Sequence, residues 1–519
     1  MQLEIKLYMK IFSSEDIRKI EEATIKEQGI TRLELIERAA AAVTYEVEGR
    51  LKASSKLIFF AGPSENGAQA LAIARMLHND GFSQMEVCLF NIGGNCLSPE
   101  CAKNKDALLK LDGISFQEIT YSFTPPVIEE TDIVIDGLFG AELSAPLSRG
   151  YDSVVRYINE NSLFTIAIDC PSGLLSEWNY KSARNNIICA KLTYANQFTH
   201  LSFYFRENAE FIGEVKILDL DYSKSAIKAM QTQYNLVRSK EVRMALHNRN
   251  AFANKYDYGH LMIIAGSYGM AGAAIMASRA ALRSGCGVVT VHTPRSCYTP
   301  LQCAVPEVMV DADDGDIIIN NLANINTGRT LSAIVVGPGL RRLEDTVNAL
   351  EQFFVGQCKV PCVLDADGLN CVSDFPALLD RLPELCILTP NNAEFERLFG
   401  KCFTDEARLT RAIEESQKRN IIIVVKGHYT MVVRPDGRVF INSTGNAGMA
   451  TAGSGDALAG IVGALLAQKY TPEVASVLAV YIHGYAGDLA ANVQGKYGMI
   501  TSDLIDNIGI AIKDIMSSK

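Results

Sequence analysis

The sequence predicts an α/β protein with two doubly wound domains. In the first half of the 519-residue chain, short β-rich runs such as KLIFFAG (56–62) and DIVIDGLFG (132–140) alternate with helical stretches. A second series, from GHLMIIAG (259–266) to IIIVVKG (421–427), repeats this alternation. Strands joined through helices form parallel sheets covered by helices on both faces. The observations therefore predict two such sheets, one in each half.

The remaining elements follow the same rule along the chain. A helical pattern begins at Ser13 with a Ser/Asp-type start and is interrupted by Gly29. A polar segment follows GEVKILDLDY (213–222), so we expect a linker at 226–240 between domains at 1–225 and 241–519. Further strands are expected within 85–91, 164–173, 287–294, 333–340, 361–370 and 385–392.

The composition is typical of a soluble protein. The 49 basic and 59 acidic residues give a net charge of −10, which argues against a general nucleic-acid binder. The 13 cysteines include no CxxC pair and are expected to be reduced core thiols. The start resembles no secretory signal, and no apolar run reaches the roughly 18 residues of a membrane span. We expect a cytoplasmic protein with neither membrane nor nucleic-acid partners.

The most specific candidate site is AGSGD (452–456), which precedes a helix expected to be apolar on all faces and buried. A helix start presents unpaired N–H groups and the positive end of its dipole, and glycines let a phosphate approach the backbone. Asp456 at this position is either an N-cap or a functional acid. Its small neighbours favour a site.

Other polar groups follow strands of the second half. VLDADGLN (363–370) and LTPNNAEFERL (388–398) each place acids or amides where a helix cap and a site are equally expected. Together with Lys426 in VVKGHYTMVV (424–433), they favour a nucleotide site. The glycines of AGSYGMAGAAIMASRAALRSGCG (265–287) fit neither GxGxxG nor a Walker loop, so tight packing of strand and helix is the favoured interpretation.

Taken in order, these segments resemble the ribokinase-like ADP/ATP-dependent NAD(P)H-hydrate dehydratases over residues 240–519. The first half is similar to NAD(P)H-hydrate epimerase domains through DIVIDGLFGAELSAPLSRGY (132–151) and AIDCPSGL (167–174). The whole chain thus resembles the bifunctional NAD(P)H-hydrate repair enzymes. This implies a Rossmann-like three-layer αβα domain followed by a ribokinase-like αβα domain.

The dehydratase family restores the S hydrate of NADH or NADPH at the expense of ADP or ATP. The resemblance makes Asp456 the base for the ring hydroxyl, and we expect the helix dipole to lower its pKa and keep it ionised. Backbone groups of residues 452–455 would hold phosphate. Mg²⁺ would accompany the nucleotide, organised by Asp367 or Glu394.

The resemblance also implies the binding residues. It places the nucleotide against Lys426, Gly427, His428, Tyr429, Thr430 and Gly455, and the hydrate against Ala273, Gly339, Asn391 and Asp456. Where the family has TPHPGE this chain has TPNNAE, so Asn391 can hydrogen-bond but cannot titrate.

The epimerase family interconverts the R and S hydrates. The resemblance implies a K⁺ ion held by Asn66, Asp136 and Ser172, and Asp169 as the acid/base group. The hydrate would contact Asn66 and the loop Ala141, Glu142, Leu143, Ser144, Ala145, Pro146 and Leu147. The family's GPGNNGGDG is GPSENGAQA (62–70) here. Added Cβ atoms and the new Glu65 carboxylate predict a weakened epimerase.

Two alternatives stay open at this point. The chain could be another ribokinase-like kinase acting on a vitamin or thiazole alcohol, although the extra N-terminal domain and the PSGL motif argue against it. The N-terminal half could also be a non-catalytic binding or assembly module. By family analogy we expect a homo-oligomer, and we expect residues 1–8 to be a start-site artefact, because the family-like sequence begins at Met9.

Overall fold

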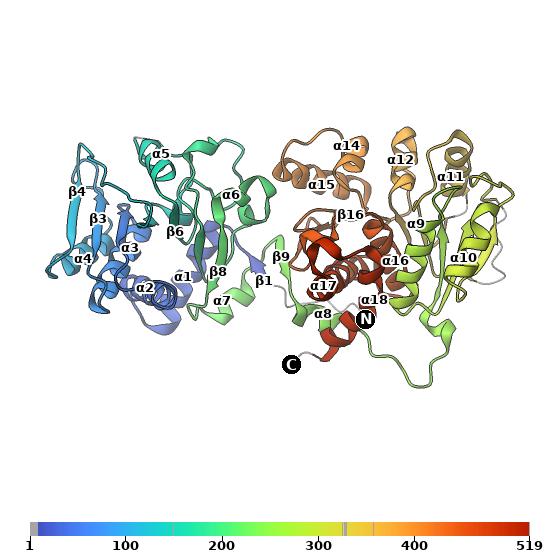
Figure 1. Ribbon diagram of the computed structural model, residues 1–519, viewed down its shortest axis with the longest axis horizontal. Helices are drawn as coiled ribbons and strands as arrows, with labels where there is room; N and C mark the ends of the chain where they lie inside the picture. The colour runs from blue at the N-terminus through green and yellow to red at the C-terminus, as the bar shows by residue number, and fades with distance from the viewer. Residues whose placement is uncertain (1–8, 149, 324, 326–329, 357, 518–519) are drawn as a thin grey trace. The chain divides into compact units, whose positions relative to one another are not determined.

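The computed structural model describes residues 9–517 except 149, 324, 326–329 and 357. The chain divides into two compact units, an N-terminal one of Lys10–Thr232 and a C-terminal one that begins at Gln233 (Figure 1). The expected linker at 226–240 is structured, because it contains the end of one helix, a strand and the start of another helix. The expected start-site artefact at residues 1–8 lies outside the described residues.

The N-terminal unit is built on a parallel sheet with strand order β4-β3-β2-β5-β6-β7-β8. Its strands are β2 Leu57–Ala61, β3 Met85–Phe90, β4 Ser115–Ile119, β5 Ile133–Gly137, β6 Phe164–Ile168, β7 Leu192–Asn196 and β8 Glu214–Leu218. The short β1 Met9–Ile11 comes before them in the chain and is not part of this sheet. Its helices are α1 Ser14–Gln28, α2 Arg32–Glu48, α3 Glu65–Asn79, α4 Pro99–Leu108, α5 Tyr151–Asn161, α6 Ala209–Ile212 and α7 Lys224–Ala229.

Both faces of this sheet are buried, which explains its continuous apolar strands. In β2, Leu57 and Phe59 face a core shared with α1, α2, α3 and α4, whereas Ile58 and Phe60 face a core shared with α5. The strand order reverses between β2 and β5. Ligands of open α/β sheets bind at such a reversal, beyond the carboxyl ends of the strands. The fold therefore directs attention to the segments that follow β2 and β5.

The C-terminal unit has a larger sheet, in which β9-β18-β17-β16-β15-β14-β13-β10-β11-β12 lie in that order. Its strands are β9 Tyr234–Val237, β10 His260–Ile264, β11 Val288–Thr293, β12 Met309–Ala312, β13 Ala333–Val336, β14 Cys362–Leu364, β15 Ile387–Leu388, β16 Ile422–Val425, β17 Met431–Val433 and β18 Val439–Asn442. Strands β10 to β16 pair with one another in parallel, whereas β17 is antiparallel to both of its neighbours, β16 and β18.

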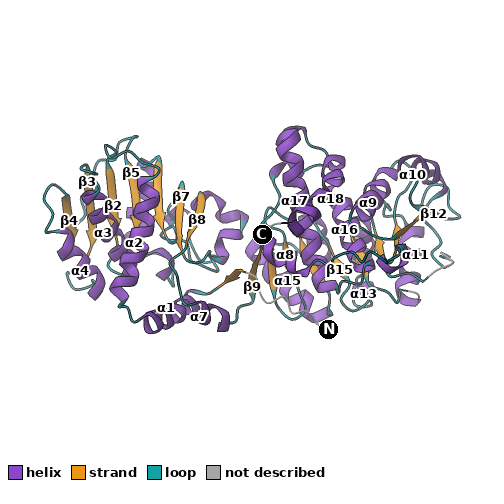
Figure 2. Cartoon of the chain, turned by 90° about the horizontal axis from the view of Figure 1, so that it is seen from below, coloured by secondary structure: helices purple, strands orange, loops and turns teal. Residues whose placement is uncertain are grey.

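Helices cover both faces of this second sheet (Figures 1 and 2). They are α8 Ser239–Ala245, α9 Ala271–Arg283, α10 Tyr298–Ala304, α11 Glu344–Gly356, α12 Asp367–Asp374, α13 Pro376–Leu379, α14 Asn392–Phe399, α15 Asp405–Arg419, α16 Ser454–Ala467, α17 Pro472–Gly498 and α18 Thr501–Ser517. Helices α9, α16, α17 and α18 share one large apolar core with the sheet.

Helix α16 is buried all round, as its sequence predicts. Every residue from Ala457 to Ala467 is buried. A Cβ on Gly460 would lie 2.2 Å from the carbonyl oxygen of Ala277 in α9, so only glycine permits this close helix contact. The contact explains the small residues in both helices as packing residues.

Helix α17 was not singled out from the sequence as a membrane-length segment. Among the described residues it is the helix with the length and mean hydropathy of a membrane span, and 67% of its apolar window is buried inside the structure. It packs against α16 and α18, as a core helix does. The absence of a membrane partner stays a prediction.

The structure confirms the predicted strands and the first helix. Ser13 caps α1 by accepting a hydrogen bond from the Asp16 N–H group, and Gly29 ends that helix in the left-handed region at φ 66°. All thirteen cysteines are free thiols. Strands β1, β4, β7, β8, β9, β12, β17 and β18 were not predicted. Several are short or carry polar residues, as in SFQEI of β4, and acquire strand structure only through pairing.

Candidate active sites

The C-terminal unit contains a cavity of about 880 Å³ at the carboxyl ends of its parallel strands. Such a volume is in the range of small-molecule and cofactor sites. Its walls come from the segments after β14, β15, β16 and β18 and from the start of α16. The cavity brings together, from the predicted set, Asn391, Glu394, Lys426, Gly427, His428, Thr430, Gly455 and Asp456.

The start of α16 has the geometry of an anion-binding helix terminus. Gly453 is its N-cap, with φ 87°, and makes no side-chain cap bond. Asp456 is the third residue of the helix and lines the cavity, so it is not the N-cap. The Ser454 N–H group donates to the carbonyl oxygen of Thr451 at 3.4 Å, so the N–H groups of Gly455 and Asp456 are the ones placed to meet a ligand.

The expectation that the dipole lowers the pKa of Asp456 is wrong. Burial, together with the negative charge of Asp365, raises the pKa of Asp456 to about 7, although Lys426 opposes this. Loss of water and like charges outweigh the partial charge of the helix end here. Asp456 thus titrates near neutrality, where a catalytic base is efficient.

Lys426 is the cation at the centre of this acidic group. Its Nζ atom lies 2.8 Å from Oδ1 of Asp365 and 3.9 Å from Oε2 of Glu394. Burial alone would lower the pKa of Lys426, but Asp365 and Glu394 raise it, so the amine stays charged. Asp365 is itself buried and accepts a hydrogen bond from Thr389. This fixes the amine beside Gly455, where a Cβ would lie 3.3 Å from it.

Two of the predicted polar residues form a helix cap, and a third lies at a helix start without capping it. Asn391 is the N-cap of α14, and it forms a reciprocal capping box with Glu394. Asp367 opens α12 and accepts a hydrogen bond from the Arg341 N–H group at 2.8 Å. Asn391 and Glu394 still line the cavity, whereas Asp367 is not among its lining residues. Of the two candidates for organising Mg²⁺, the structure therefore favours Glu394.

The remaining predicted residues of this unit lie outside the cavity wall. Ala273 and Gly339 adjoin each other, because a Cβ on Gly339 would lie 3.0 Å from that of Ala273. They belong to α9 and to the loop after β13, and neither they nor Tyr429 are among the described residues that line the 880 Å³ cavity. The hydrate contacts expected there stay predictions.

Sequence reasoning missed two residues of α17. His483 lines the cavity and contacts Ser454, and Asp488 accepts hydrogen bonds from the Gly445 N–H group and the Asn446 side chain. The available signal was the presence of a histidine and an aspartate in the otherwise apolar stretch AVYIHGYAGDLAA. Polar side chains in a buried helix need partners, and here the partners form the walls of the cavity.

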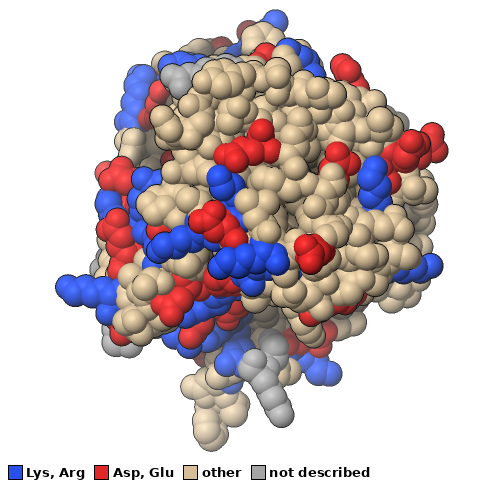
Figure 3. Space-filling model, turned by 90° about the vertical axis from the view of Figure 1, so that its left-hand side faces the viewer, with Lys and Arg blue, Asp and Glu red and all other residues tan. Residues whose placement is uncertain are grey.

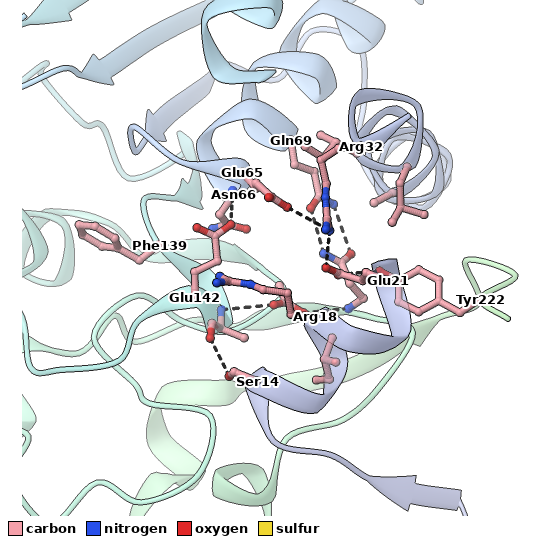
Figure 4. Close-up of a pocket in the computed structure, with 17 residues that line it drawn as sticks. Ser14, Arg18, Glu21, Arg32, Glu65, Asn66, Gln69, Phe139, Glu142 and Tyr222 are labelled. Carbon is pink, nitrogen blue, oxygen red and sulfur yellow. Dashed lines mark hydrogen bonds and ion pairs between the residues drawn. The ribbon is translucent and has the colours of Figure 1, made fainter. Parts of the chain in front are cut away.

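The N-terminal unit has a smaller cavity, of about 90 Å³, where the strand order reverses. Figure 4 shows Glu21 and Glu65 converging on Arg32 at one side, with Glu142 beside Asn66 at the other. Basic and acidic side chains are also interspersed over the face seen in Figure 3. From the predicted set, the cavity brings together Asn66, Ala141, Glu142 and Asp169.

Asp169 is held in a strained but well-defined conformation. Its φ of 64° lies in the left-handed region, which costs free energy for a residue other than glycine. Its carboxylate accepts hydrogen bonds from the N–H groups of Ala141 and Asn196 and lies 3.4 Å from Nε2 of His200. Burial alone would raise the pKa of Asp169, but His200 and these bonds lower it. The group is therefore an ionised acceptor at neutral pH.

Two of the three predicted K⁺ ligands, Asp136 and Ser172, contact each other, and the ion itself stays a prediction. Asp136 is fully buried and accepts hydrogen bonds from both the N–H and the hydroxyl of Ser172, each at 2.7 Å. Burial raises the pKa of Asp136 to about 6. Asn66 is buried nearby, within 2.9 Å of a Cβ built on Gly140, and its Nδ2 atom has no hydrogen-bond partner in the described part of the chain. A buried carboxylate with hydroxyl and amide oxygens is a donor set for a hard cation.

The altered glycine loop keeps the glycines that the backbone requires. A Cβ on Gly62 would lie 1.7 Å from the carbonyl oxygen of Leu138, and one on Gly67 would lie 1.8 Å from that of Gly62. Ala68 is buried within α3 and Glu65 is the first residue of that helix. The effect of the added Cβ at Ala68 stays a prediction. What changes is the charge, because Glu65 lines the cavity.

The loop after β5 enters the cavity only at its start. Ala141 and Glu142 line it, and Glu142 accepts a hydrogen bond from the Asn66 N–H group at 3.1 Å. Although Glu142 is exposed as a residue, loss of water around its carboxylate and the nearby Glu65 raise its pKa to about 7. The rest of the predicted loop, Leu143, Ser144, Ala145, Pro146 and Leu147, is not among the described lining residues.

Together, the two sheets and their strand-end sites define a two-domain α/β enzyme with one ligand site in each domain. A family described as NAD(P)H-hydrate dehydratase matches residues 261–509, and one described as YjeF-related protein N-terminus matches residues 32–201. The bifunctional NAD(P)H-hydrate repair enzyme Nnr of Gloeobacter violaceus is 30% identical over 439 residues, 83% of each chain. That of Moorella thermoacetica is 28% identical over 529 residues, 98% of this chain and 97% of its own. The chain belongs to this family of bifunctional NAD(P)H-hydrate repair enzymes.

A solved structure is also similar to the C-terminal unit. The ADP/ATP-dependent NAD(P)H-hydrate dehydratase from Bacillus subtilis, co-crystallized with ATP and Mg²⁺, is 29% identical with a TM-score of 0.48. The match covers 54% of this chain and 97% of that one.

Proposed function

We propose that the protein repairs hydrated NADH and NADPH, with a C-terminal dehydratase that consumes ADP or ATP and an N-terminal epimerase that interconverts the R and S hydrates. Family membership over nearly the whole chain supports this proposal. The observation that carries it is Asp456, which lies in the first turn of α16 inside a nucleotide-sized cavity.

In the dehydratase, the nucleotide phosphates bind the free N–H groups at the start of α16, beside the charged Lys426. Asp456 accepts the proton of the ring hydroxyl as that oxygen takes the terminal phosphoryl group of ATP or ADP, which leaves as ADP or AMP. Phosphate then leaves the ring carbon, and the adjacent ring carbon loses a proton, which restores the double bond of the reduced nicotinamide. Lys426 and the N–H groups stabilise the negative charge of the transferred group. Mg²⁺ bound with the nucleotide would add further charge neutralisation, and Glu394 is the carboxylate placed to hold it.

In the epimerase, Asp169 accepts or returns the proton while the hydroxyl-bearing carbon changes configuration. Asn66, Asp136 and Ser172 would hold a K⁺ ion, which would supply a fixed positive charge for the oxygens of the hydrate. The ionised state of Asp169 suits a proton acceptor, and its two backbone hydrogen bonds fix its orientation.

The dehydratase is tested with purified S hydrate, Mg²⁺ and ADP or ATP. The absorbance of reduced nicotinamide should return, and no return with either nucleotide would contradict this function. A ribokinase-like vitamin or thiazole-alcohol kinase would instead phosphorylate such alcohols and leave the hydrate unchanged.

The epimerase is tested with R hydrate in the presence of K⁺, comparing the wild type with Asp169→Ala. Consumption by the wild type alone supports the epimerase. Equal background rates support the second candidate, a non-catalytic N-terminal module, which is favoured by the small 90 Å³ cavity with its Glu65 and Glu142 carboxylates.

We also propose that the protein works in the cytoplasm as a homo-oligomer without nucleic-acid or membrane partners. The free thiols and the net charge of −10 support the compartment and the absence of nucleic acid. Subcellular fractionation tests the compartment and the absence of a membrane partner, and light scattering tests the oligomeric state.

A further inference from the structure

His483 of α17 is turned towards the first residue of α16. Its Nε2 atom lies 2.9 Å from the carbonyl oxygen of Ser454 and 3.3 Å from the Ser454 hydroxyl. The histidine is 9% exposed, and both residues line the 880 Å³ cavity. The role assigned above to Asp456 and Lys426 does not use this side chain.

The contact fixes the state of the imidazole ring. Burial lowers the pKa of His483 to about 4, with the positive charge of Lys426 acting in the same direction, so the ring is neutral at physiological pH. A carbonyl oxygen can only accept, so Nε2 must carry the hydrogen. A nitrogen that carries its hydrogen cannot accept one from the Ser454 hydroxyl. The hydroxyl hydrogen therefore stays available to a ligand oxygen in the cavity.

Within the described residues, the backbone at the start of α16 is also held by the Ser454 N–H group, which donates to the carbonyl oxygen of Thr451 at 3.4 Å. Gly453 makes no side-chain cap bond, and the preceding Ala452 is held through its carbonyl oxygen, which accepts a hydrogen bond from Thr501 at 2.7 Å. His483 supplies the next fixed point along the chain. Because α17 is packed within the core, its side chain defines where the first turn of α16 can lie.

We propose that His483 is a positioning residue of the phosphate-binding turn, which acts through Ser454 to hold the backbone N–H groups and the Ser454 hydroxyl in the orientation that a phosphoryl group requires. This inference rests on the proposed dehydratase. His483 does not touch the reacting atoms, and it transfers no proton. Its contribution is the geometry of donors that must be in place before the phosphoryl group moves.

The test uses the full-length protein with His483→Gln, which keeps an N–H donor at the position of Nε2, and His483→Leu, which removes it. His483→Leu should lower kcat by about 10- to 100-fold, as small misplacements of donors do, and leave the KM for the hydrate nearly unchanged. His483→Gln should recover most of this loss with the wild-type pH profile. His247→Gln is the matched control, because His247 stacks on Tyr470 away from the cavity.

Two further measurements test the contact between His483 and Ser454, one by spectroscopy and one by a double-mutant cycle. The ¹⁵N spectrum of the His483 imidazole should show the Nε2–H tautomer. Because the pKa of His483 is about 4, this signal should not change with pH above about 5. Ser454→Ala and His483→Leu should combine non-additively in kcat, because the two side chains act as one unit. If His483→Leu does not fold, the ¹⁵N spectrum of the wild type and the comparison of His483→Gln with the wild type remain as tests.

If the wild type dehydrates the hydrate and His483→Leu does so at the same rate, the positioning role is overturned and the proposed function stands. A loss in His483→Gln equal to that in His483→Leu, with a changed pH profile, would also overturn it, because the ring would then act as an acid or base. If the wild type does not dehydrate the hydrate, the proposed dehydratase function is contradicted. The ¹⁵N spectrum would still show whether His483 donates through Nε2.

Discussion

Nζ of Lys426 lies 2.8 Å from Oδ1 of Asp365, and Asp456 shares the cavity with this pair. The pair joins β14 and β16 through side chains at their carboxyl ends. Burial raises the pKa of Asp456 to about 7, and the negative charge of Asp365, which Lys426 only partly offsets, acts in the same direction. The first two predictions below start from this raised pKa.

Replacing the proposed base should separate binding from chemistry. Asp456→Asn should retain the fold and nucleotide binding, because the N–H groups of α16 are unaffected, while dehydration falls by about 10²- to 10⁴-fold. Binding is measured by calorimetry with ADP, and turnover by the return of reduced-nicotinamide absorbance. In the wild type, activity should fall as the pH drops below about 7, because Asp456 becomes protonated. A variant that dehydrates at the wild-type rate would show that Asp456 is not the base.

The same substitution should stabilise the C-terminal unit at neutral pH. A carboxyl group whose folded pKa is raised from 3.8 to about 7 contributes its stability at low pH and loses it as the pH rises through the folded value. Asp456→Asn should therefore melt at a higher temperature than the wild type at pH 8, and the difference should shrink between pH 7 and pH 4. Thermal unfolding over this range is the measurement. An equal difference at every pH would mean that the charge of Asp456 is not the cause.

The glycine loop of the N-terminal unit should be sensitive at Gly67 and tolerant at Ala68. Gly67→Ala should lower the free energy of unfolding of that unit by about 1–3 kcal/mol or more, because the added Cβ would lie 1.8 Å from the Gly62 carbonyl oxygen. Ala68→Gly is the control and should cost about 1 kcal/mol or less, as expected for glycine inside a helix. Chemical denaturation measures both, with dehydratase activity as the reference for the other unit. Equal stability of Gly67→Ala and the wild type would contradict the close backbone contact.

A buried ion cluster should make the C-terminal unit less stable at alkaline pH. His292 contacts Asp311 through Nδ1 at 2.9 Å and Asp313 through Nε2 at 3.1 Å. Burial alone would lower the pKa of His292, but the two carboxylates raise it above 6.5. The stabilisation is therefore complete below pH 6.5 and is lost as the pH rises through the folded pKa.

His292→Gln tests this cluster. It should cost about 3 kcal/mol at pH 6, as loss of one partner of a buried pair does, and less at pH 9. Asp313 also accepts hydrogen bonds from the backbone N–H groups of Gly315, Asn320 and Asn321. The amide hydrogens of this loop should therefore exchange faster in the variant. The opposite trend, with a larger cost at pH 9, would rule out a charged His292.

Local patterns in the sequence were sufficient where local physics decides. The apolar runs became strands, Ser13 became a cap and the segment after Asp456 became a buried helix. The same patterns could not choose between cap and site at Asn391 and Asp367, because both uses need the same side chains at the same helix start. The strands β17 and β18 were missed because they have only three and four residues and acquire strand structure by pairing with neighbouring strands, in the case of β18 also with the distant β9.

The sequence by itself determined the two α/β units, the glycines that the backbone requires and the strand ends where polar residues gather. Only the tertiary structure decided the charge state of those residues. The pKa of Asp456 depends on burial and on Asp365, which is 91 positions earlier in the chain. The contact of His483 with Ser454 likewise joins two separate helices. Electrostatic energies depend on distances in space and on exclusion of water, and neither is written in local sequence.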